Sequence, residues 1–129
     1  GFVPSTLAED GDPLDVLIYN ETPIDRGTLV ECNVIGVLDM KDSGGQDWKL
    51  LVTPTSHVRK YRSIKDVDPM FIKIASYFFK HYKDLNNSYV EVGEWYGKQK
   101  AYEIIKDCCN RFNPTESLAK YQKPLDLQV

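Results

Sequence analysis

The sequence contains few of the side chains that bind soft metals or build disulfide frameworks, with only two histidines and three cysteines in 129 residues. Cys108 and Cys109 are adjacent and lack the spacing of redox motifs, which predicts free thiols in a reducing compartment. Basic residues are scarce too: 16 Lys and Arg against 19 Asp and Glu give a net charge of −3, which disfavours a sequence-independent nucleic-acid binder. No apolar stretch approaches the length of a bilayer span. We therefore expect one globular, cytoplasmic domain with no nucleic-acid or membrane partner.

What the sequence does contain is a dense acidic cluster near its start. Asp10, Asp12 and Asp15 lie within six residues, next to Gly11 and Pro13. Carboxylates this close repel one another unless a cation neutralises them. Oxygen ligands without nearby Cys or His predict Mg²⁺, Mn²⁺ or Ca²⁺. The alternative is a solvated turn, because Asp, Gly and Pro are all turn formers.

Two further groups of polar residues are candidates for chemistry. Asp47 and Lys49 lie two apart on a predicted strand, near Asp42, and so face one side of it. They predict a site for a metal and a phosphate, or else an exposed ion pair of small energetic value. Tyr82 and Lys83 end a predicted helix, where they offer hydrogen-bond donors to phosphate; Lys83 also complements the helix dipole.

The order of predicted elements places strands first and helices last. Apolar and β-branched runs predict strands at 16–19, 28–38, 47–53 and 89–92, with a bulge or bend at Gly36. Asp68 and Pro69 predict the start of a helix that ends near residue 84, and a second helix begins near Lys98. We expect the apolar stripe of the first helix to be core; its members are Phe71, Ile74, Ala75, Phe78, Phe79 and Tyr82. The class is α+β with a barrel-like or strongly curved sheet, and residues 113–129 form an extended tail.

Three segments, in this order and spacing, resemble the soluble, Mg-dependent inorganic pyrophosphatases: residues 10–17, residues 36–49 and residues 78–85. The resemblance extends from Gly1 to about residue 112 and implies one catalytic domain over 1–112. The implied fold is an OB-like five-stranded β-barrel with two outer helices. The implied activity is hydrolysis of diphosphate to two orthophosphates by a metal-activated water.

The resemblance also implies a role for each polar group. The implied metal ligands are Asp10, Asp15, Asp42 and Asp47, the implied catalytic residue is Asp12, and the implied substrate-binding residues are Lys49, Tyr82 and Lys83. The implied cofactor is Mg²⁺, two or more ions per site, with Mn²⁺ as a substitute. The implied assembly is a homo-oligomer, and Trp48 beside Asp47 favours a dimer over a hexamer.

The sequence departs from the family at two places. Ser43 and Gln46 stand where carboxylates are common, which we expect to weaken an accessory metal. The family's segment ahead of Gly1, which supplies barrel strands and further site residues, is absent. We therefore expect this chain to be the C-terminal two-thirds of a pyrophosphatase, poorly active by itself. The alternatives are a non-catalytic OB-like module and a structural metal-binding domain.

Overall fold

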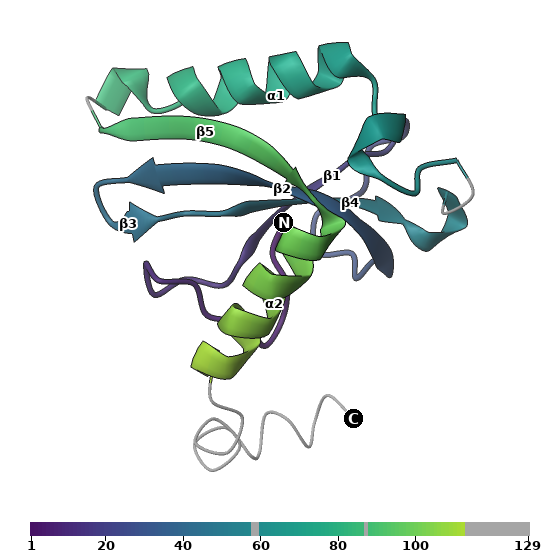
Figure 1. The fold of residues 1–129 in the computed structure, drawn as a ribbon, viewed down its shortest axis with the longest axis horizontal. Coiled ribbons are helices and arrows are strands. Elements are labelled where there is room, and N and C mark those ends of the chain that lie inside the picture. Colours follow the sequence, from purple (N-terminus) through teal and green to yellow (C-terminus); the bar gives the residue numbers. More distant parts are fainter. Residues whose placement is uncertain (58–59, 87, 113–129) are drawn as a thin grey trace.

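A five-stranded mixed sheet lies between two helices in the computed structural model, which describes residues 1–57, 60–86 and 88–112 (Figure 1). The strands are β1 (Asp15–Ile18), β2 (Cys32–Asp42), β3 (Gly45–Gln46), β4 (Lys49–Pro54) and β5 (Val90–Gly97). The helices are α1 (Pro69–His81) and α2 (Lys98–Phe112), with short 3-10 turns η1 (Thr55–His57), η2 (Ile64–Asp66) and η3 (Asp84–Asn86). The tail expected at 113–129 lies outside the described residues.

Strand β2 is the centre of the sheet. It pairs with β4 and β3 along the path β1-β4-β2-β3, and β5 pairs with it separately; only the β1–β4 pair is parallel. The α+β class and the five strands are confirmed. The sheet is strongly twisted but its strand path does not close within the described residues, so the expected barrel is an open, curved sheet there.

The two faces of the sheet carry separate hydrophobic clusters. Leu50 and Val52 belong to the cluster that contains α2, whereas Leu51 belongs to the cluster that receives α1. This alternation is the ordinary consequence of strand geometry, and it buries β4 on both faces. Strand β4 is therefore a central strand rather than one with a solvated face.

The predicted irregularity at Gly36 is confirmed. The β2–β4 register shifts between Val34 and Gly36, so one extra residue, Ile35, enters β2 and packs on the α1 side. A Cβ atom on Gly36 would lie 2.5 Å from the backbone oxygen of Tyr96, which is closer than any side chain permits. Glycine at this position lets β5 approach β2.

Helix α1 begins at the predicted residue, but it buries less of its apolar surface than predicted. The Asp68 carboxylate accepts a hydrogen bond from the Met70 N–H at 2.9 Å, and Pro69 takes the first helical position. The prediction that the whole apolar stripe is core is wrong for Ile74, Phe78 and Tyr82, which are 60%, 56% and 39% exposed. The helix contacts the sheet through only part of its apolar surface.

Element boundaries differ modestly from the predictions. The strand expected at 28–38 begins at Cys32 and continues to Asp42, and the strand expected at 89–92 continues to Gly97. Helix α1 ends at His81, and α2 starts at Lys98 as expected. Among the described residues, no helix combines the length and apolar character needed to cross a bilayer.

Candidate active site

The first part of the site is the acidic loop, residues 10–15, which leads into β1. Leu14 is fully buried, and its backbone N–H donates to the Thr6 hydroxyl at 3.0 Å. That hydroxyl in turn donates to the Val3 carbonyl at 2.6 Å, so the loop is fastened to the preceding segment. The Asp10 carboxylate accepts from the Asp12 N–H at 3.0 Å. These bonds fix the loop while leaving its carboxylates at the surface of the sheet.

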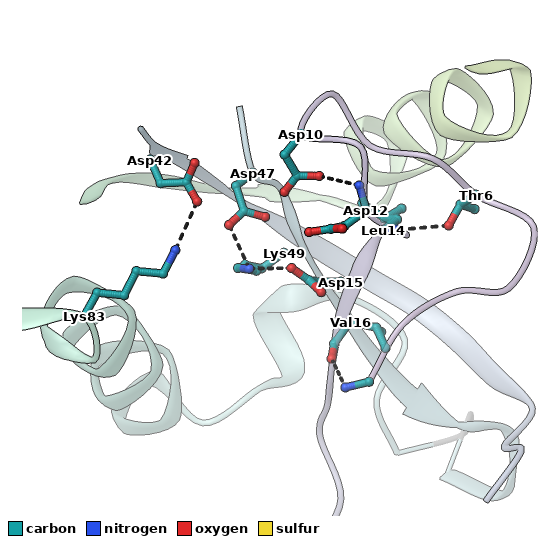
Figure 2. Close-up of polar contacts among 11 residues, drawn as sticks. Thr6, Asp10, Asp12, Leu14, Asp15, Val16, Asp42, Asp47, Lys49 and Lys83 are labelled. Atoms are coloured by element: carbon teal, nitrogen blue, oxygen red, sulfur yellow. Dashed lines mark hydrogen bonds and ion pairs between the residues drawn. The ribbon is translucent and has the colours of Figure 1, made fainter. Parts of the chain in front are cut away.

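Glycine at position 11 shapes the acidic loop. Gly11 has a φ of +91°, which places it in the region that L side chains rarely adopt. The resulting turn lets Asp10 and Asp12, on either side of it, direct their side chains into the same space as Asp47 (Figure 2). The segment is a turn with Asp12 exposed, as the alternative expected, and it also directs its acidic side chains toward a second segment.

The second part is the hairpin between β2 and β4, residues 40–47. Asp42 ends β2 and accepts a hydrogen bond from the Gly44 N–H at 2.8 Å. The Asp47 N–H donates to the Met40 carbonyl at 2.7 Å, which closes the hairpin. Asp47 precedes β4 rather than lying within the strand as expected. A Cβ on Gly44 would lie 3.7 Å from the Cβ of Asp10, so the hairpin and the acidic loop are direct neighbours.

Strand pairing joins the two parts. Because β1 and β4 run parallel, Asp15 stands opposite Lys49 in the register. The Lys49 ammonium lies 2.6 Å from an Asp15 carboxylate oxygen and 3.0 Å from one of Asp47 (Figure 2). Asp47 and Lys49 are only 5% and 7% exposed, so the alternative of a solvent-exposed ion pair is wrong. Trp48 faces the other way, as predicted, with its ring 6.2 Å from that of Tyr96.

The end of α1 supplies the third part. The Lys83 ammonium lies 3.1 Å from an Asp42 carboxylate oxygen, a contact between residues far apart in the sequence (Figure 2). Tyr82 caps α1, and its ring lies 5.4 Å from the Lys83 ammonium. Tyr82 thus lies next to Lys83.

The structure therefore gathers almost all of the predicted residues. It brings together Asp10, Asp12, Asp15, Asp42, Asp47, Lys49 and Lys83. Sequence reasoning missed Phe79, whose ring centroid lies 5.7 Å from the Lys49 ammonium and which was assigned to the core with its stripe. It also missed Thr6, for which the sequence offered no signal because its role depends on a bond eight residues away.

Burial and pairing set the protonation behaviour of these groups. Burial, reinforced by the nearby Asp15 and Asp42 charges, raises the pKa of Asp47 despite its bond to Lys49. Burial acts in the same direction on Asp42, but hydrogen bonds from Lys83 and Gly44 outweigh it, so the pKa of Asp42 is lowered. The pKa values of Lys49 and Lys83 are raised. Burial alone would lower them, but the carboxylate partners more than offset this effect, so both ammonium groups keep their protons.

The donor set fits a hard divalent cation. Five carboxylates face two ammonium groups, and oxygen ligands without sulfur or imidazole are typical of Mg²⁺ and Ca²⁺ rather than Zn²⁺. Within 1–57, 60–86 and 88–112, no three Asp, Glu, His or Cys side chains are arranged to hold a metal ion. The donor chemistry therefore suits a divalent cation, whereas in the present arrangement the Lys49 ammonium lies between Asp15 and Asp47.

Comparisons with known proteins agree with this geometry. Residues 1–113 match the model of the inorganic pyrophosphatase family. The inorganic pyrophosphatase of Geobacillus stearothermophilus is 40% identical over 115 residues, which cover 88% of this chain and 70% of that protein. The solved structures of inorganic pyrophosphatases from Coxiella burnetii and Neisseria gonorrhoeae match this chain with TM-scores of 0.83 and 0.82 at 37% and 38% sequence identity. Each covers 88% of this chain, and the chain covers 70% and 68% of theirs respectively. A sequence match and a fold match of this extent, on a site of clustered carboxylates and lysines, show that the chain belongs to the inorganic pyrophosphatase family, the hydrolases of diphosphate.

Proposed function

We propose that this diphosphate hydrolase uses Mg²⁺ and that Asp12 orients the attacking water and accepts its proton. The observation that carries the proposal is the convergence of the acidic loop, the hairpin and the end of α1 on one space. The Asp12 carboxylate lies next to that of Asp10 and points toward the side on which Asp47 lies (Figure 2). A carboxylate so placed can accept a hydrogen bond from water and fix the direction of its lone pair.

Four carboxylates would hold the metal: Asp10, Asp15, Asp42 and Asp47. Oxygen donors from two segments suit two or more Mg²⁺ ions, with Mn²⁺ as a substitute. When bound, such ions neutralise phosphate charge and lower the pKa of coordinated water. Asp42 and Asp47 are held by backbone bonds within the hairpin, so they can keep their positions when a cation approaches.

The two lysines would bind the substrate. Each ammonium group now bonds a carboxylate, and each carries three donors that can turn to the non-bridging oxygens of diphosphate. Negative charge spreads over these oxygens in a loose transition state, so fixed cations lower its energy. Tyr82, beside Lys83, would add a phenol donor. These groups suffice without a Ser, Cys or His nucleophile.

The test is phosphate release from diphosphate by the protein, purified with its natural N-terminus, with and without Mg²⁺. Asp12→Asn should lower kcat by about 10²–10⁴-fold while leaving the circular dichroism spectrum unchanged. The matched control is Asp25→Asn, which makes the same change at an exposed turn and should leave kcat unchanged. Near-normal turnover by Asp12→Asn would contradict the assigned role, and turnover independent of divalent ions would contradict the cofactor.

A non-catalytic binding module is the less favoured alternative. A structural Ca²⁺ site has no need of Lys49 and Lys83 at the edge of its carboxylates, whereas phosphate chemistry does. Indifference to Mg²⁺ would favour the binding module, and binding of a divalent cation without any hydrolysis of diphosphate would favour the structural metal site.

We further propose a cytoplasmic homo-oligomer, a dimer rather than a hexamer. The three cysteines are free, which supports a reducing compartment. The outward side of α1 exposes Met70, Ile74, Tyr77 and Phe78, an apolar surface of the kind that subunits bury. Light scattering coupled to gel filtration measures the mass directly, and a monomer would contradict the proposal.

A further inference from the structure

The side-chain amide of Gln46 lies at the base of the hairpin that carries Asp42 and Asp47. Its Nε2 atom donates to an Asp39 carboxylate oxygen at 2.5 Å and to the Met40 carbonyl at 3.0 Å. Gln46 belongs to β3, and Asp39 and Met40 belong to β2, so one amide group ties the two strands together. None of these three residues has a role in the proposed mechanism.

Asp39 is held firmly from its other side. The β2–β5 register shifts between Leu38 and Met40, so Asp39 lies at an irregular point of the ladder. A Cβ atom on Gly93 of β5 would lie 3.1 Å from an Asp39 carboxylate oxygen and 3.3 Å from its Cβ. The Asp39 carboxylate thus lies next to Gly93, where a larger side chain on β5 would displace it.

The Met40 carbonyl links this contact to the active site. It accepts from the Gln46 amide and also from the Asp47 N–H at 2.7 Å. The bond from Gln46 therefore fixes the acceptor that places the backbone of Asp47. A change at Gln46 reaches Asp47 through one shared oxygen atom.

We propose that Gln46 is a positioning residue, which together with Asp39 holds Asp47 in place for metal binding; this rests on the proposed role of Asp47 as a ligand. Carboxylates are common at this position in the family, but in this chain the contact with Asp39 favours an amide. A carboxylate at residue 46 would meet the Asp39 carboxylate at hydrogen-bond distance, where like charges repel and neither oxygen can donate. The amide donates where a carboxylate cannot.

The decisive variant is Gln46→Glu, because the proposal and simple electrostatics predict opposite signs. Added negative charge near carboxylate ligands would by itself strengthen Mg²⁺ binding. If Gln46 is a positioning residue, Gln46→Glu weakens Mg²⁺ binding instead. The expected loss of Mg²⁺ affinity is about 10–100-fold, which is typical when a group that orients a metal ligand is changed. The dissociation constant for Mg²⁺ is measured by calorimetry, or by the fluorescence of Trp48, which lies between Asp47 and Lys49 in the sequence.

A second substitution tests whether the hydrogen bond is responsible. In the double variant Asp39→Asn/Gln46→Glu, donor and acceptor exchange places, so the side-chain bond re-forms although the bond to Met40 does not. We expect only part of the lost Mg²⁺ affinity to return, because the repulsion between two carboxylates is removed while the bond to the Met40 carbonyl stays lost. Gln46→Met, which removes the donor without adding charge, should weaken binding in the same direction and serves if Gln46→Glu does not fold.

The matched control is Gln99→Glu, the same charge change at an exposed position of α2, which should leave the dissociation constant unchanged. The proposal is overturned if Gln46→Glu and Gln46→Met bind Mg²⁺ as tightly as the parent, or if the double variant recovers nothing. Asp47→Asn separates the two proposals. If it binds Mg²⁺ normally, the role of Asp47 as a ligand fails. If it loses binding while the Gln46 variants keep it, only the positioning role fails.

Discussion

Replacing Lys49 with methionine removes the ammonium group between Asp15 and Asp47 and keeps a side chain of similar length. The lysine is nearly buried, so methionine can fill its place against Phe79. What changes is the charge. Asp47 remains in a site that water hardly reaches, without the cation that now lies 3.0 Å from its carboxylate.

The size of the effect follows from the burial of each partner. The Asp15 side chain is 44% exposed, so its ion pair contributes about 0–1 kcal/mol. Asp47 is buried, and removal of one partner from a buried pair costs about 3–5 kcal/mol. We expect the metal-free Lys49→Met protein to lose about 3 kcal/mol of its free energy of unfolding, which lowers Tm by roughly 10 °C.

The assay is urea unfolding at neutral pH, in EDTA and in excess Mg²⁺. A cation that binds the folded state stabilises it by about 2.7 kcal/mol at 100 times its dissociation constant. Because Mg²⁺ supplies the charge that Lys49→Met lacks, we expect Mg²⁺ to stabilise the variant more than the parent. The control is Lys73→Met, an exposed lysine of α1, which should change little. Equal stability of Lys49→Met and the parent in EDTA would refute the reasoning.

Three further outcomes follow from the structure. Leu14→Ala should cost about 2–5 kcal/mol of unfolding free energy because Leu14 is fully buried, whereas Leu85→Ala, at an exposed residue, should cost almost nothing; equal losses would contradict this. Because Gly11 has a positive φ, Gly11→Ala should lower the free energy of unfolding by about 1–2 kcal/mol and weaken Mg²⁺ binding, and Gly11→Asn should lower the stability less. Calorimetry measures both the stability and the Mg²⁺ affinity. An alanine variant as stable as the parent would be evidence against a strained turn. Burial raises the pKa of Cys108 and so keeps it protonated, and mass spectrometry should show that a thiol reagent modifies exposed Cys109 first; equal rates would contradict this.

Sequence rules succeeded where the determinants lie a few residues apart. Asp68 and Pro69 start α1 because a cap needs only its own side chain and the next N–H groups. Gly36 marks the bulge because only glycine admits the Tyr96 carbonyl at that distance.

The failures concern properties that depend on distant segments. The periodicity of α1 showed an apolar stripe and could not show how much of it the sheet covers, so Ile74 and Phe78 were wrongly placed in the core. The predicted alternation over residues 47–53 put Asp47 and Lys49 on one side of the strand. It did not reveal their burial, because burial depends on β1, whose Asp15 lies 34 residues before Lys49. The contact of Gln46 with Asp39 was also beyond reach, because it depends on an irregular register with β5.

The parallel pairing of β1 with β4 has a consequence for the order of folding. Strands β2 and β4 are joined by a short hairpin, which closes at a smaller entropic cost than the long connection between β1 and β4. We therefore expect β1 to dock late, after the rate-limiting step. A ligand that bridges the acidic loop and the hairpin would then slow unfolding and leave the folding rate unchanged. The contact of Asp15 with Lys49 is in this sense made late in folding, so the two halves of the proposed active site meet only after the hairpin has formed.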